Sequence, residues 1–256
     1  MSNKISIVLV LIFSTVLVSQ AQVQKNMGKF DEIKIFNGIS VKLIPGESGK
    51  VTITGENADD VVLVNRNGKL RVRMKTSKLF RGDQTQVVIQ YGKIDLIDAN
   101  ENAFVLVEGE LKNTTLQINA QEGAEVKATV NTDRLEARAI SGGILDLRGR
   151  ADMQDVTVKA GGQYDAKDLI SKQTIVVLSA GGGAKIYASD YAEAKTRAGG
   201  RIEIYGNPKE ELIGPDAITP ANCHTDWFCF EFYDWAGVFC LVGNRRYKRV
   251  PSRSGF

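Results

Sequence analysis

The segment Ala180-Gly-Gly-Gly-Ala-Lys185 is the part of the chain that most resembles a phosphate site. Glycine-rich loops ending in lysine cradle phosphates through their backbone N–H groups. A P-loop also needs a glycine four residues further back, Ser or Thr after the lysine, and a helix that starts there. Here Ile186 follows the lysine and the pattern continues as a strand. We therefore expect a structural turn and no cofactor-binding residue.

Two other segments contain residue types that bind metals. The run Asp98-Ala-Asn-Glu-Asn102 begins like a calcium loop, but Ala103 stands where the sharp turn needs Gly and Gly109 where a bidentate Glu belongs. Residues 223–229 hold two cysteines and the chain's single histidine, but without the pair-and-pair spacing of zinc ligands. We expect no metal site at either place.

Charged residues that recur along the chain could act on polysaccharides. Glycoside hydrolysis needs two carboxylates that face each other about 5 to 10 Å apart. Asp146 and Asp165 could align on adjacent layers of a repeat, as could Lys127, Arg148 and Lys167. The simpler interpretation is a mixed-charge face in contact with solvent, because the body of the chain contains no histidine to act as a base. We assign no catalytic residue.

The elements that would position these residues follow a repeat. Turns of small residues and glycine recur every 18 to 20 residues, at 118–124, 137–143, 158–162, 178–183 and 196–200, with a weaker copy at 97–103. Short runs of alternating apolar and polar residues flank each turn, which indicates strands with one buried face. Repeated at constant spacing, such strands stack one on another. The pattern predicts an all-β, right-handed, single-stranded parallel β-helix or β-solenoid, with rungs of about 20 residues from roughly Ile97 to Pro208.

The preceding region is less regular. Alternating residues predict separate strands at 30–36, 39–44, 50–54, 61–64, 69–74 and 86–91. Asn37-Gly38, Pro45-Gly46 and Asn67-Gly68 are typical turn pairs, and residues 57–60 are the one plausible helical turn. These strands are either early, irregular rungs of the same solenoid or a small sheet that caps it.

The order of these motifs resembles a known family. The opening Phe30-x-x-Ile-x-Ile-x-Asn-Gly-Ile-Ser-Val-x-Leu-Ile-Pro-Gly46, the Gly68-Lys-Leu strand and the closing Ala198-Gly-Gly-x-Ile-x-Ile-Tyr-Gly-Asn-Pro208 are similar to the head GIN domain family (DUF2807), also called auto-transporter adhesins. The resemblance covers about residues 30–209. It implies a β-helix-like fold and export in Bacteroidetes-type bacteria, and it carries no catalytic residue. This chain departs from the family by using Ala-Gly-Gly where members often show Ser-Gly-Ser-Gly.

The two ends of the chain differ from its body. Lys4, the apolar run from Ile5 to Val18 and the small residues before Gln22 predict a signal peptide over residues 1–21. No cysteine lies near that cleavage point, so we do not expect a lipoprotein. We expect no later transmembrane segment, so the mature protein should be periplasmic, secreted or on the cell surface.

The last segment, residues 210–256, holds all three cysteines and both tryptophans. It is either an aromatic cap on the open end of the solenoid or a frameshifted translation. The body of residues 22–209 contains no cysteine, so disulfides do not hold its fold.

Charge does not select the partners. The 33 Lys and Arg are nearly balanced by 30 Asp and Glu, with both signs interspersed, which does not predict a nucleic-acid partner. We expect a non-catalytic exported binding or structural module, adhesin-like or interacting with the cell envelope, with a glycan or a surface protein as partner. The alternative is a β-helix lyase or glycosidase acting on polysaccharides.

Overall fold

The computed structural model describes residues 22–78, 82 and 85–214. The predicted signal peptide, the segment from residue 215 onward and the candidate zinc ligands lie outside the described residues. The described chain is almost entirely strand, with two short 3-10 turns, Ala58–Asp60 (η1) and Thr76–Lys78 (η2). The first of these confirms the single helical turn expected at residues 57–60.

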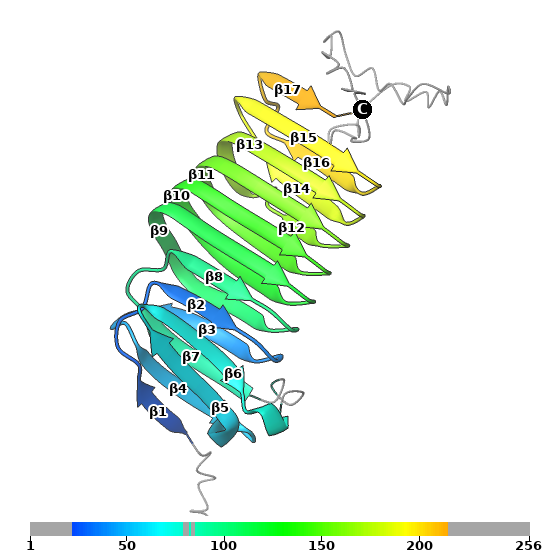
Figure 1. The fold of residues 1–256 in the computed structure, drawn as a ribbon. Coiled ribbons are helices and arrows are strands. Elements are labelled where there is room, and N and C mark those ends of the chain that lie inside the picture. Colours follow the sequence, from blue (N-terminus) through cyan, green and yellow to red (C-terminus); the bar gives the residue numbers. More distant parts are fainter. Residues whose placement is uncertain (1–21, 79–81, 83–84, 215–256) are drawn as a thin grey trace, which may run out of the picture.

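The strands form a stack of rungs with two broad faces (Figure 1). The first face contains β3 (Ser40–Pro45), β7 (Thr85–Tyr91), the beginnings of β9 (Phe104–Gln121), β10 (Glu125–Ile140) and β11 (Ile144–Lys159), and then β12 (Gln163–Asp165), β14 (Gly183–Tyr187) and β16 (Arg201–Tyr205). The second face contains β2 (Glu32–Ile35), β6 (Lys69–Met74), β8 (Leu96–Ala99), the ends of β9, β10 and β11, and then β13 (Leu169–Ser179), β15 (Tyr191–Arg197) and β17 (Glu210–Ile213). The predicted β-solenoid is confirmed.

The register confirms the repeat length. On the first face, parallel pairing places Glu125, Ile144, Gln163, Gly183 and Arg201 in line, 18 to 20 residues apart. A period of whole rungs keeps every second residue inside, because side chains alternate across a strand. On the second face, Ile97, Ile118 and Ala137 are therefore in register and fully buried.

The turns between the second and first faces also stack. In each rung two successive residues have positive φ: Asn37-Gly38, Glu101-Asn102, Glu122-Gly123, Ser141-Gly142, Ala160-Gly161, Ala180-Gly181 and Ala198-Gly199. Backbone N–H groups of one turn donate to carbonyls of the next, as from Gly123 to Ser141 and from Gly142 to Ala160. The glycine turns found in the sequence are thus the corners of the solenoid. Asn37-Gly38 belongs to the same series.

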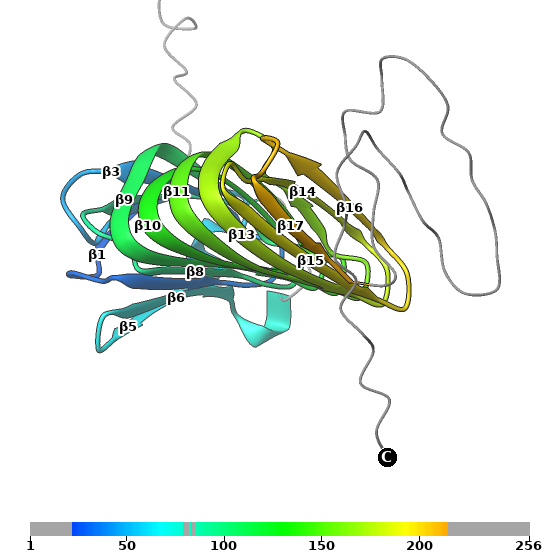
Figure 2. The same ribbon diagram turned by 90° about the horizontal axis from the view of Figure 1, so that it is seen from above.

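The strands are longer than the short runs predicted. In β9, β10 and β11 the first-face strand of one rung and the second-face strand of the next form one continuous strand that curves between the faces (Figure 2). Thr132 stabilises this bend, because its hydroxyl donates to the carbonyls of Thr114 and Arg134. Later rungs break at the same edge, between β12 and β13, β14 and β15, and β16 and β17.

The N-terminal region contains both a rung and a cap, so the two interpretations left open by the sequence both hold in part. Strands β2 and β3 form a regular rung that pairs with β6 and β7 on one side and with β8 and β9 on the other. Strands β1 (Val23–Asn26), β4 (Lys50–Gly55) and β5 (Val61–Arg66) add antiparallel pairs that close this end of the stack (Figure 1). The solenoid therefore starts at β2 and extends to β17, beyond the predicted limits of Ile97 and Pro208.

The interior is filled by the chain's own side chains. Apolar residues from every rung are buried, and a polar cluster interrupts them in the later rungs. There the Tyr164 hydroxyl donates to Gln154 Oε1 at 2.6 Å, and Gln154 Nε2 donates to the Leu169 carbonyl at 3.3 Å. Burial raises the pKa of Tyr164, so its hydroxyl stays neutral. Because the inside is occupied by packed side chains, recognition has to be sought on the outward side chains.

Candidate binding surface

The first face presents a line of charges along the stack. Lys127, Asp146, Asp165, Lys185 and Glu203 are in register on successive strands, each outward between two buried neighbours. Each charge in the line has an opposite partner within 3.4 Å: Glu125 for Lys127, Arg148 for Asp146, Lys185 for Asp165 and Arg201 for Glu203. These pairs are solvent-accessible and add little to stability. They do fix the positions of the side chains on a flat surface.

The predicted alignment of Asp146 with Asp165 is confirmed, since the two residues are paired directly on β11 and β12. The predicted alignment of the three basic residues is wrong. Lys127 is in register with Asp146, Arg148 is in register with Thr129, and Lys167 lies in the corner after β12. The irregular corner breaks the register that a uniform repeat would impose.

The two aligned carboxylates do not have the arrangement that glycoside hydrolysis needs. Asp146 and Asp165 project from neighbouring strands of one face, about 4.8 Å apart at the backbone. A glycosidase places its two carboxyl groups on opposite sides of the scissile bond. Each of these carboxylates is instead bonded to a basic side chain, Asp146 to Arg148 and Asp165 to Lys185.

At the last rungs of the first face, aromatic residues join the line of charges. Tyr187 and Tyr205 are in register on β14 and β16, and both side chains are half-buried. The Tyr205 hydroxyl donates to Glu203 Oε2 at 3.0 Å. Burial and this hydrogen bond raise the pKa of Tyr205, so the hydroxyl remains a donor at neutral pH.

Sequence reasoning missed this tyrosine pair. The signal was present, because Lys185-Ile-Tyr187 and Glu203-Ile-Tyr205 end their strands at the same position relative to the preceding glycine turn. Alignment on the turns would have placed the two rings side by side.

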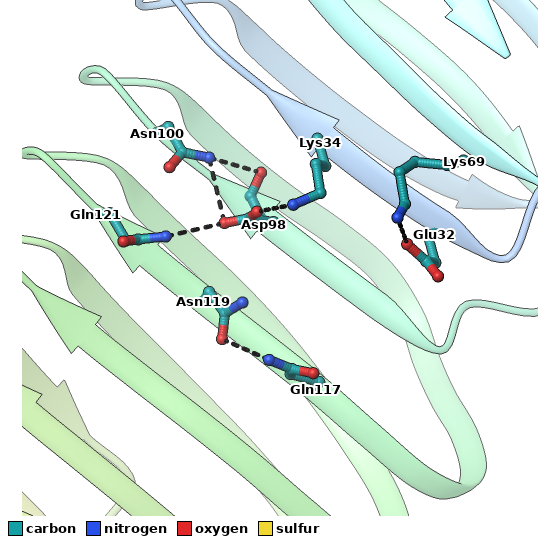
Figure 3. A network of polar contacts seen from close by, with 8 residues as sticks. All are labelled: Glu32, Lys34, Lys69, Asp98, Asn100, Gln117, Asn119 and Gln121. Atoms are coloured by element: carbon teal, nitrogen blue, oxygen red, sulfur yellow. Dashed lines mark hydrogen bonds and ion pairs between the residues drawn. The ribbon is translucent and has the colours of Figure 1, made fainter. Parts of the chain in front are cut away.

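The second face has a polar network near the N-terminal end of the stack (Figure 3). Asp98 is its centre: the carboxylate accepts from Lys34 Nζ at 2.6 Å and from the amides of Asn100 and Gln121 at 3.2 Å each. These partners leave the Asp98 side chain only 8% exposed. Beside it, Gln117 donates to Asn119, and Lys69 pairs with Glu32 (Figure 3).

This network explains the calcium-like sequence as structure. Asp98 lies on strand β8 and its oxygens are bonded to cationic and amide donors, so the residue supports stacking of the β2, β8 and β9 strands. Within the described residues, no group of three or more His, Cys, Asp or Glu is placed to hold a metal ion.

The glycine-rich segment is a turn followed by a strand. Ala180 and Gly181 form the positive-φ corner, and β14 begins at Gly183, where a phosphate-binding loop would begin a helix. Gly182 is tightly packed, since a Cβ there would lie 2.4 Å from the Gly162 carbonyl oxygen. These glycines are required by the stacking of the turns.

A family model matches residues 29–208, and its description is "Putative auto-transporter adhesin, head GIN domain" (DUF2807). The chain belongs to this family. Membership of the head GIN domain family agrees with the motifs quoted from the sequence and with the extent of the solenoid. No curated protein matches the chain.

Solved structures share the head GIN architecture at low identity. A "putative adhesin" from Bacteroides fragilis superposes with a TM-score of 0.73 at 16% identity, covering 79% of this chain and 95% of that one. A "putative lipid binding protein" from Parabacteroides distasonis gives 0.61 at 14% identity, with 77% and 93% covered. A "putative adhesin" from Parabacteroides merdae gives 0.58 at 19% identity, with 78% and 94% covered. At these identities the likeness shows the fold alone.

The search for a membrane-crossing helix covers the same described residues. None of the helical segments there is long and apolar enough to span a bilayer.

Proposed function

We propose that this head GIN protein is a non-catalytic binding module, exported by a signal peptide over residues 1–21 and adhesin-like in its action at the cell envelope or surface. The domain would comprise residues 22–209. One observation supports this proposal most: the outward side chains form flat, in-register lines whose charges are bonded to each other, on a core that is already filled. A rigid surface of this kind suits recognition, because little conformational entropy is lost on binding.

The family description and two of the three related structures carry the word adhesin, which favours the same reading for this chain. The lipid-binding description of the Parabacteroides distasonis structure belongs to that protein. The packed interior of the present chain favours ligands that bind on the outside.

An array of glycans and purified envelope components tests this function. The chain from Gln22 onward is expected to bind at least one class of these molecules saturably, with competition by the same molecule in solution. Chain unfolded in urea serves as the control and should not bind, because the surface exists only in the stacked rungs. If the folded chain bound no glycan and no envelope component, the binding function would be wrong.

A further inference from the structure

The outward end of the first face is built from two tyrosines. Tyr187 and Tyr205 are paired in register, and the buried residues Ile186 and Ile204 before them point into the core. Because side chains alternate along a strand, both rings are placed on the solvent side, one above the other along the stack. Within the described residues, β16 is the last strand of this face.

Both rings are held in place by neighbouring groups. The Tyr187 ring lies against Gly206, where an added Cβ would be 2.7 Å from Tyr187 Cε1. The Tyr205 ring is fixed through its hydrogen bond to Glu203. Arg201 Nε holds the other oxygen of Glu203 at 2.9 Å, and this carboxylate side chain is 18% exposed. Side chains that are ordered beforehand lose little entropy when a ligand binds.

The charges around the rings cancel. Lys185 pairs with Asp165 at 3.0 Å, and Arg201 pairs with Glu203, so two cations face two anions. The hydrogen bond from Asp165 raises the pKa of Lys185, which keeps this pair ionised at neutral pH. The surface therefore attracts neither anions nor cations by net charge, but it offers fixed hydrogen-bond donors and acceptors beside two aromatic rings.

A ligand that fits this surface has no charge, many hydroxyl groups and an apolar face that can lie on a ring. Sugars in neutral polysaccharides have this combination, with C–H groups on the ring faces and hydroxyls at the edges. Tyrosine suits such a ligand, because it combines an apolar ring with a polar tip.

We propose that Tyr187 and Tyr205, with Asp165, Lys185, Arg201 and Glu203, form a binding platform for neutral glycans. This inference rests on the proposed binding function and specifies its ligand class and its site. An acidic polysaccharide would have to displace the Asp165 and Glu203 ion pairs. A protein partner would gain little from a flat surface whose charges are already paired.

The test measures binding of the full chain to immobilised neutral glucan, mannan and galactan oligosaccharides, with acidic polysaccharides in parallel. The variant Tyr187→Ala/Tyr205→Ala is expected to weaken binding to the neutral glycan about tenfold or more, because both ring contacts are lost. The matched control is Tyr191→Ala. Tyr191 lies on the second face and donates to Glu193 two residues away at 3.0 Å, as Tyr205 does to Glu203, and its removal should leave the affinity unchanged.

Two further measurements separate the site from the fold and the ligand class. Tyr187→Phe/Tyr205→Phe keeps both rings and should retain most of the binding, while far-UV circular dichroism checks that each variant folds. Added salt should change the affinity little, because no net charge is neutralised.

Glycan binding that is unchanged in Tyr187→Ala/Tyr205→Ala would overturn the site and leave the binding function standing. Binding confined to acidic polysaccharides or to envelope proteins, and weakened by salt, would overturn the ligand class. If the wild-type chain bound nothing on either array, both the platform and the proposed function would fail.

Discussion

Replacing Gly162 by alanine is expected to lower the free energy of unfolding by about 3 kcal/mol, the upper range for forcing an extra carbon into a packed site. A Cβ at Gly162 would lie 2.2 Å from the Ala139 carbonyl oxygen, which belongs to the adjacent rung. The clash is with backbone, so no side-chain rotation can relieve it. The rungs would have to separate where the Gly183 N–H donates to the Gly162 carbonyl at 3.0 Å.

The neighbouring residue provides a matched control. Gly161 has φ of +78° but nothing within 4 Å of a built Cβ. Asparagine adopts this left-handed conformation more readily than other residues, so Gly161→Asn should cost less than about 1 kcal/mol. Urea unfolding followed by circular dichroism measures both variants. Equal stability of the two variants would show that the rungs are not packed as closely at this turn as described.

The second large effect is expected at the buried polar cluster. Tyr164→Phe removes the donor to Gln154 Oε1 and leaves that oxygen inside the solenoid without its 2.6 Å partner. An unsatisfied buried acceptor costs about 1 to 3 kcal/mol. The variant should therefore unfold at lower urea concentration, although it removes only one oxygen atom.

A double-mutant cycle checks the cause. Gln154 follows Leu116 and Leu135 in register on the second face, so an unbranched apolar residue fits its position. Tyr164→Phe combined with Gln154→Met removes both members of the hydrogen bond, and the double variant should be more stable than the sum of the single losses predicts, by about 1 kcal/mol. Strictly additive losses would mean that the two side chains do not interact in the folded protein.

The sequence was most informative where the chain repeats itself without interruption. The glycine turns from Asn102 to Gly199 are the stacked corners, because a positive-φ pair at each corner requires glycine or a residue that tolerates that conformation. The strand at residues 69–74 was predicted with its observed limits. Local patterns of this kind act through neighbouring residues, which is why they can be read from the chain.

The arrangement of the N-terminal rungs could not be read in that way. Strand β2 pairs with β8, so that Ile33 lies beside Ile97, 64 residues later in the chain. The intervening strands β4, β5, β6 and β7 fold onto the other side of the β2–β3 rung. Spacing in sequence therefore does not give position in the stack, and the turn at Asn37-Gly38 could not be recognised as a member of the series.

The outer surface was predicted only in part for a related reason. A uniform period places Asp146 beside Asp165, as observed, but the corner after β12 changes the local spacing and separates Lys167 from Arg148. The tyrosine pair became visible only when β14 and β16 were paired. Pairing decides which outward residues become neighbours, and that depends on the whole rung.

The central claim is that this chain binds through its outer surface and performs no chemistry there. The most direct test incubates the full chain with the polysaccharides that it retains and measures released sugar ends over time, alongside Asp146→Asn/Asp165→Asn. We expect bound polysaccharide to be recovered intact in both cases. Steady release of products by the wild-type chain, lost in the Asp146→Asn/Asp165→Asn variant, would contradict the account and show an enzyme.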